Sequence, residues 1–146
     1  GVLTMRVSVA FAVYVFLLGL HPAQAEIAVI VNPANPVQTL TARQVAELYL
    51  GRTRSFESGD FAVIADQGRD APLRAQFFKS ATSMSMAQVT AYWSRLKFTG
   101  QVQPPQNMEG DAAIVDFVRR HHWAIGYVDK AAAPDNKVKT VLILKE

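Results

Sequence analysis

Short apolar runs alternate with helix-forming segments along most of this chain. Four such runs have strand length and are rich in Val, Ile and aromatic residues: 26–32, 61–65, 123–129 and 138–144. Strands buried on both faces between helices are typical of α/β proteins. The sequence therefore predicts an α/β three-layer sandwich with a mixed, mostly parallel sheet covered on both faces.

Capping residues mark the expected starts of the helices. Thr41 and Ser85 are each followed three residues later by glutamine, which is the pattern of a capping box. Asp70 precedes Pro72, so we expect Asp70 to cap a helix that reaches Lys79. The other expected segments are a helix end at Gly51, a loop over 99–110, a helix over 111–121 and a turn or short helix over 130–136.

An apolar segment near the N-terminus has the organisation of a secretory signal peptide. Arg6 precedes the apolar run 7–20, and the Ala-Gln-Ala at 23–25 fits a cleavage site. The run is shorter than the ~20 apolar residues of a typical membrane span. We therefore expect a cleaved signal peptide over 1–25, with residues 1–4 lying upstream of an initiator at Met5.

The remaining residues, 26–146, are expected to form one exported domain, periplasmic or otherwise outside the cytoplasm, with no stable membrane anchor after cleavage. The segment has 121 residues, enough for a single hydrophobic core. The chain is 50% hydrophobic and 18% charged, which excludes a disordered protein. It contains no cysteine, so disulfides, cysteine-ligated zinc and thiol nucleophiles are excluded.

Catalytic and metal-binding motifs are not found. His121 and His122 are adjacent, so on a helix they point about 100° apart and cannot act as an i, i+4 metal-binding pair. The spacing in 66–70 (DQGRD) does not match a calcium loop. The net charge of +3 is small and its basic residues are scattered, so nucleic acid is not an expected partner. We expect no enzyme activity, no metal and no cofactor.

One loop is suited to an anion. The segment 66–70 follows a predicted strand and leads into a helix start, where unpaired N–H groups and the helix dipole favour anions. Arginines provide bidentate hydrogen bonds to oxyanions. The expected ligand contacts are Gln67, Gly68, Arg69 and Arg74, together with Asn32 at the end of the first strand. Asp66 and Asp70 oppose an anion by repulsion or by pairing with the arginines, and an ordinary solvated loop remains the alternative.

Several motifs, in order and at fitting spacing, resemble the second lobe of the periplasmic phosphate-binding proteins of ABC importers. They are Leu-Thr at 40–41 with Tyr-Leu-Gly-Arg at 49–52, Tyr-Trp-Ser-Arg at 92–95, Phe-Thr-Gly at 98–100, Pro-Pro at 104–105 and Ala-Ile-Gly-Tyr-Val at 124–128. The resemblance implies a single lobe of a type II periplasmic-binding-protein-like fold and an exported protein.

The ligand-binding motif of that family is altered here. The Ser-Gly-Thr that binds phosphate in the family falls at 71–73 (Ala-Pro-Leu), and Pro72 has no N–H to donate. Of the family's arginines, Arg74 matches. The resemblance implies a solute-binding protein for phosphate or another oxyanion, associated with a membrane transporter or sensor.

Two alternatives stay open. The lobe could instead be a protein-interaction module that has lost its ligand, or two copies could share one site. The oligomeric state does not follow from the sequence.

Overall fold

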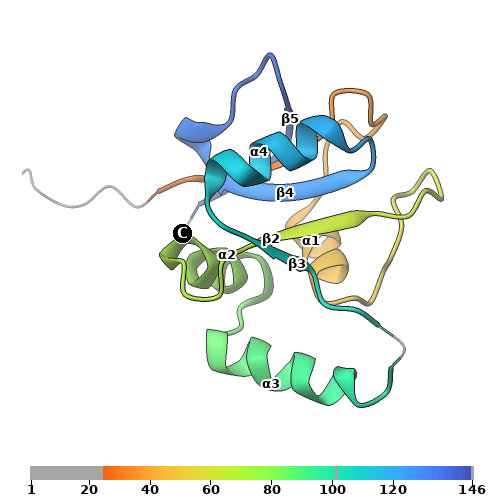
Figure 1. The fold of residues 1–146 in the computed structure, drawn as a ribbon, viewed down its shortest axis with the longest axis vertical. Coiled ribbons are helices and arrows are strands. Elements are labelled where there is room, and N and C mark those ends of the chain that lie inside the picture. Colours follow the sequence, from red (N-terminus) through yellow and green to blue (C-terminus); the bar gives the residue numbers. More distant parts are fainter. Residues whose placement is uncertain (1–24, 101, 146) are drawn as a thin grey trace, which may run out of the picture.

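The computed structural model describes residues 25–100 and 102–145. They form one five-stranded sheet in the order β3-β2-β4-β1-β5 (Figure 1). The strands are β1 Ile27–Val31, β2 Val63–Gln67, β3 Gln106–Met108, β4 Ala124–Asp129 and β5 Lys139–Leu144. β2 runs parallel to both β3 and β4, whereas β1 is antiparallel to β4 and β5. The predicted α/β fold with a mixed sheet is confirmed, and only β1 runs against the other strands.

Helices cover both faces of this sheet. They are α1 Ala42–Tyr49, α2 Pro72–Thr82, α3 Met86–Lys97 and α4 Asp111–Arg120, and a short 3-10 turn follows β4 at Lys130–Ala132. α4 packs through Ile114 and Val118 on one face, in a cluster with Ala65 and Val128. α1, α2 and α3 contribute to a larger cluster on the other face. α3 lies farthest from the sheet, beyond α2 (Figure 1).

The helix starts were predicted well at two positions and wrongly at one. Thr41 and Ser85 both form complete capping boxes with the glutamine three residues on. Asp70 is not a cap: the N-cap of α2 is Ala71, which makes no side-chain cap hydrogen bond. Ala71 has no side-chain oxygen that could accept a hydrogen bond, so α2 begins without a side-chain cap, and Pro72 leaves one fewer N–H unpaired in the first turn.

The predicted loop over 99–110 was wrong in one part. Residues 106–108 pair with β2 as the short edge strand β3. This strand is polar (Gln-Asn-Met) and follows two prolines, so neither hydrophobic periodicity nor β-propensity marks it. Its pairing brings Asn107 next to Asp66, which matters for the site below.

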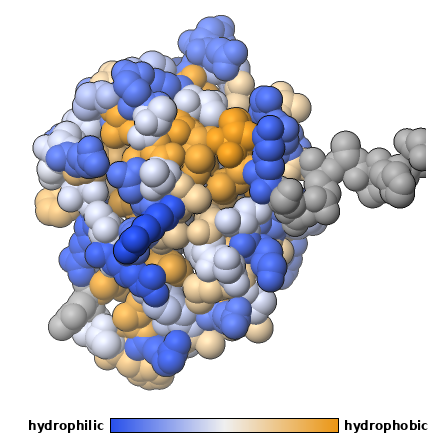
Figure 2. Space-filling model, turned by 180° about the vertical axis from the view of Figure 1, so that it is seen from behind, coloured by the Kyte–Doolittle hydropathy of each residue, from blue (hydrophilic) through white to orange (hydrophobic). Residues whose placement is uncertain are grey.

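The predicted signal peptide lies outside the described residues apart from Ala25. Within the part of the chain that the structure describes, no helix has the length and apolar character needed to cross a membrane. Seen from behind, hydrophobic side chains gather in one area of the surface, bordered by hydrophilic ones (Figure 2). The surface of the lobe is therefore not uniformly polar.

Candidate anion-binding cleft

A cleft lies between the connection from β2 to α2 and the helix α3. Its inner part has a volume of about 240 Å³ and its outer part about 340 Å³, and the two parts share Arg69, Arg74 and Thr90. The inner part is otherwise lined by Asp66, Val89, Trp93, Ser94, Lys97, Pro104, Pro105 and Asn107, and the outer part by Asp70, Met86 and Ala87. Because β2 ends at Gln67, the cleft lies at the carboxyl end of a parallel strand, where α/β proteins bind ligands.

α3 contributes one polar stripe to this cleft. Thr90, Ser94 and Lys97 are spaced i, i+4 and i+7, so they lie on the same side of the helix. Val89 and Trp93 lie beside them and are buried in the core, which fixes the rotation of the helix. The apolar positions of α3 therefore decide which polar residues face the cleft.

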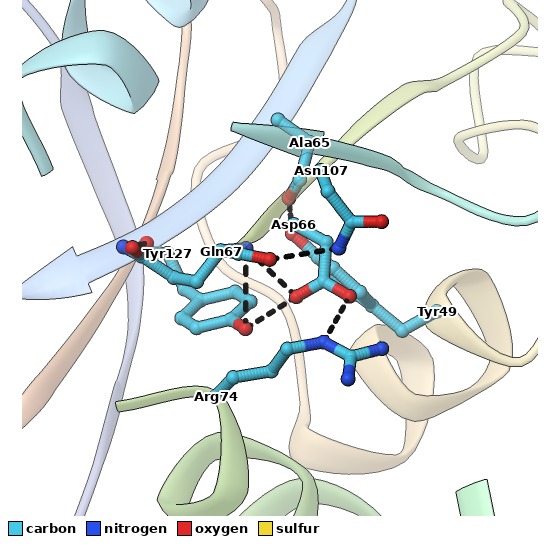
Figure 3. Close-up of polar contacts among 7 residues, drawn as sticks. All are labelled: Tyr49, Ala65, Asp66, Gln67, Arg74, Asn107 and Tyr127. Atoms are coloured by element: carbon cyan, nitrogen blue, oxygen red, sulfur yellow. Dashed lines mark hydrogen bonds and ion pairs between the residues drawn. The ribbon is translucent and has the colours of Figure 1, made fainter. Parts of the chain in front are cut away.

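The floor of the cleft holds a buried carboxylate, that of Asp66, with 1% of the residue exposed. Its Oδ1 accepts hydrogen bonds from the Gln67 backbone N–H at 2.8 Å and from the Tyr127 hydroxyl. Its Oδ2 accepts from Nε of Arg74 at 2.8 Å (Figure 3). A buried charge needs such donors, because its desolvation is costly. Asp66 thus takes three donors that an anion bound at this strand end would otherwise use.

Two tyrosines enclose the carboxylate from the core side. Burial, and then the negative charge of Asp66, raise the pKa of the Tyr127 phenol, which also donates to that carboxylate. Burial and the same charge raise the pKa of Tyr49, whose hydroxyl donates to the Ala65 carbonyl at 2.7 Å. The Tyr127 ring is stacked on Phe77, with centroids 3.7 Å apart. Both phenols therefore stay protonated and hold the floor of the cleft rigid.

Arg74 is held in place from two sides. Its Nε is paired with Asp66, and its Cζ lies 5.2 Å from the centroid of the Phe78 ring. The side chain is 14% exposed. The terminal nitrogens of the guanidinium point away from Asp66 (Figure 3). Arg74 therefore has donors for a ligand even though Asp66 occupies its Nε.

Positively charged side chains outnumber carboxylates in the cleft. Arg69, Arg74 and Lys97 line the inner part together with one carboxylate, Asp66. Asp70 adds a second carboxylate in the outer part. Asn107 also lines the inner part, where its Nδ2 donates to the Gln67 carbonyl at 2.8 Å. The inner part is therefore cationic overall, which suits a small anion.

The structure brings Arg69 and Arg74 together in the cleft, but not the other predicted contacts. Gln67 is buried, and its Nε2 donates to Oδ1 of Asp111 at 2.7 Å and to the Tyr127 carbonyl at 3.0 Å. Gly68 is buried beneath Glu109: a Cβ on Gly68 would lie 3.2 Å from that carboxylate. Neither residue is among those lining the cleft.

Asn32 lies at the other end of the sheet. β1 runs antiparallel to β4, whereas β2 runs parallel to it, so the end of β1 is opposite the end of β2. The Asn32 Nδ2 donates to the carbonyls of Val118 at 3.0 Å and Arg119 at 2.9 Å, in the last turn of α4. Its amide therefore satisfies free carbonyls at a helix end, and it does not join the arginines.

Sequence reasoning missed the contribution of α3 and β3 to the cleft. Thr90, Ser94, Lys97 and Asn107 line it, but none belongs to the loop that was expected to bind the anion. The i, i+4, i+7 spacing of the three α3 residues is visible in the sequence. It indicates a polar helix face, but not which loop that face meets. Among residues 25–100 and 102–145, no group of three or more His, Asp or Glu side chains is placed to hold a metal ion.

The fold of this chain matches those of solved phosphate-binding proteins. A protein assigned as a phosphate ABC transporter substrate-binding protein from Clostridium perfringens, solved with bound phosphate, superposes with a TM-score of 0.63 at 21% identity, over 80% of this chain and 45% of that one. An ABC-type phosphate transport receptor from Vibrio cholerae also superposes with a TM-score of 0.63, at 18% identity, over 80% of this chain and 46% of that one. PstS from Borrelia burgdorferi superposes with a TM-score of 0.57, at 10% identity, over 83% of this chain and 47% of that one.

These likenesses confirm the fold resemblance inferred from the motifs. By description, the first of these solved chains is a substrate-binding protein and the second is a phosphate transport receptor. This chain spans about half of the length of each of the three. No family model matches the sequence, and no curated protein sequence matches it. The chain therefore has a solute-binding-protein-like α/β fold of single-lobe size.

Proposed function

We propose that this lobe binds a small anion in the cleft and serves a membrane transporter or sensor from outside the cytoplasm. The observation that carries the proposal is the set of three cationic side chains, Arg69, Arg74 and Lys97, that lines one cleft with a single inner carboxylate. The likeness in fold to phosphate-binding proteins of transporters supports it. The signal-peptide pattern over 1–25 supports export.

Binding would use charge-assisted hydrogen bonds and no covalent step. Arg74 is pre-positioned by Asp66 and Phe78, so little side-chain entropy is lost when its terminal nitrogens meet a ligand. The side chains of Arg69 and Lys97 are exposed at different positions along the cleft, where either can contact a bound anion. The hydroxyls of α3 supply neutral donors.

Calorimetric titration of the purified chain with phosphate, sulfate and a carboxylate tests the proposal. We expect binding of at least one of these anions. We also expect Arg69→Ala to weaken that binding about tenfold, because it removes a charged hydrogen-bond donor. Arg95→Ala is the matched control, since Arg95 is exposed on α3 but does not line the cleft. Absence of heat with every anion up to millimolar concentration would contradict the proposal.

A second candidate function is docking to another protein. A hollow of about 320 Å³ with a mixed polar and apolar lining lies beside the cleft, and Leu48, Ile64 and Val102 belong to its apolar part. Phe61 lies at this hollow and is 75% exposed, so it offers apolar surface to a partner. If no anion binds, and Phe61→Ser abolishes association of the chain with the membrane fraction of its cell, this second function is favoured.

A further inference from the structure

The cleft is longer than a single tetrahedral oxyanion. The residues of α3 that line it run from Met86 in the outer part to Lys97 in the inner part. From Thr90, where the two parts meet, to Lys97 is about 10 Å along the helix axis at 1.5 Å per residue. A compact ion at one position would leave much of this length empty.

The cations are spread along that length instead of converging on one point. Arg69 and Arg74 lie where the two parts meet, because both residues line both parts. Lys97 lines only the inner part and belongs to the last turn of α3. Two centres of positive charge are therefore available, one formed by the two arginines and one by the lysine.

Apolar side chains also line the inner part of the cleft, along with the two centres of positive charge. Trp93, Pro104 and Pro105 contribute to the inner part together with Lys97. A tetrahedral oxyanion gains nothing from such a wall, whereas a hydrocarbon chain is stabilised by contact with it.

The Asp66 carboxylate adds a constraint on charge. It lies 2.8 Å from Nε of Arg74, so an anion with two charges on one centre would bring both of them close to a fixed negative charge. Repulsion falls with distance, so a ligand that carries its second charge far from Asp66 is favoured.

Building on the proposed anion-binding function, we propose that the ligand is a short aliphatic dicarboxylate. One carboxylate binds to Arg69 and the terminal nitrogens of Arg74, and the other binds to Lys97. The hydrocarbon chain lies against Trp93 and the two prolines. The ligand class is thus an organic acid with two charged ends, and inorganic phosphate binds less tightly.

Calorimetric titrations with acetate, phosphate, succinate and glutarate at equal ionic strength test this inference. We expect a dicarboxylate to bind at least tenfold more tightly than acetate or phosphate, which corresponds to one added charged contact. Lys97→Met should lower the dicarboxylate affinity about tenfold, to near that of acetate, and should lower it more than it lowers acetate affinity. Lys97 is exposed, so this variant is expected to fold.

Arg95→Met serves as the matched control, because two residues along a helix it points about 160° away from Lys97. The proposal of a ligand with two charged ends would be overturned by any of three results: equal affinities for acetate and the dicarboxylates, tighter binding of phosphate, or no effect of Lys97→Met. Anion binding that still depends on Arg69 would then leave the proposed function standing. Absence of binding by all four anions would overturn both.

Discussion

At the scale of single residues, Asp66 organises the candidate site. Its carboxylate joins the end of β2 to Tyr127 in β4 and to Arg74 in α2. A phosphate-like anion would make similar contacts with a strand-end N–H, a hydroxyl and an arginine. The chain therefore carries its own anion at the innermost position, and an external ligand must bind outside it.

Asp66→Ala is expected to destabilise the fold by about 3 kcal/mol, because it leaves the largely buried guanidinium of Arg74 without its partner. The partial exposure of Arg74 keeps the cost at the low end of the range for a broken buried pair. Urea unfolding followed by circular dichroism measures the loss. The control is Asp60→Ala, whose carboxylate accepts an exposed hydrogen bond from Ser58. Equal stability of the two variants would contradict a structural role for Asp66.

Gly126 allows α4 to approach the sheet closely. A Cβ at Gly126 would lie 2.6 Å from Cγ2 of Ile114 and 3.3 Å from Cγ2 of Val118. Gly126→Ala should therefore cost about 1–3 kcal/mol through overpacking, measured as a lower midpoint of thermal unfolding. Gly68→Ala is the comparison, because the three atoms nearest to its new Cβ all belong to the flexible end of the Glu109 side chain. A stabilised Gly126→Ala variant would show that α4 can move away at no cost.

At the scale of elements, side-chain caps distinguish α3 from α2. The Ser85 hydroxyl accepts from the Gln88 N–H at 3.2 Å, and the Gln88 side chain accepts from the Ser85 N–H at 2.8 Å. Ser85→Ala is therefore expected to cost about 1 kcal/mol of unfolding free energy. Asp70→Ala should leave stability nearly unchanged, because α2 has no side-chain cap hydrogen bond. Denaturant titrations of both variants measure these losses. Equal losses of unfolding free energy would show that Asp70 does cap α2.

The sequence predicted the elements whose signal is local. Thr41 and Ser85 cap helices with contacts three residues away, and β1 is apolar along its whole length. β3 could not be predicted in this way, because a polar strand is recognised only by its pairing with β2.

For the candidate site too, the sequence indicated residues with a local signal and missed those that tertiary packing brings in. Arg69 in the loop after β2 does line the cleft, since its position after a strand is a local feature, and its contact with an anion stays a prediction. Asn32 was grouped with it because the direction of β1 is a property of the whole sheet, and no residue of the strand encodes that direction. Lys97 was missed because its meeting with the loop depends on how α3 packs against α2 and the sheet.

At the scale of the whole molecule, the larger core and the floor of the cleft share residues. Tyr49 and Tyr127 are fully buried in the cluster that α1, α2 and β4 form, and both lie near Asp66. Stability of the fold and the shape of the cleft are therefore coupled through these two phenols.

The raised pKa values of Tyr49 and Tyr127 predict that the fold loses stability above about pH 10, the usual pKa of tyrosine in an unfolded chain. Above that pH the unfolded chain releases both protons, whereas the folded chain retains them, so unfolding is favoured progressively as the pH rises. Each phenol contributes a limiting slope of about 1.4 kcal/mol per pH unit. Below pH 10 neither phenol makes stability depend on pH.

Urea unfolding between pH 8 and 11 measures this slope, and tyrosinate absorbance should rise together with the loss of structure. Tyr127→Phe removes one of the two titrating groups, so its stability should fall less steeply with pH, even though its stability at pH 8 is lower because Asp66 loses a donor. Because the two proteins differ only at this phenol, the comparison of slopes isolates its contribution from that of the other groups. Tyrosinate absorbance that rises before structure is lost would show that water reaches the phenols in the folded state, and the floor of the cleft would then be open instead of rigid.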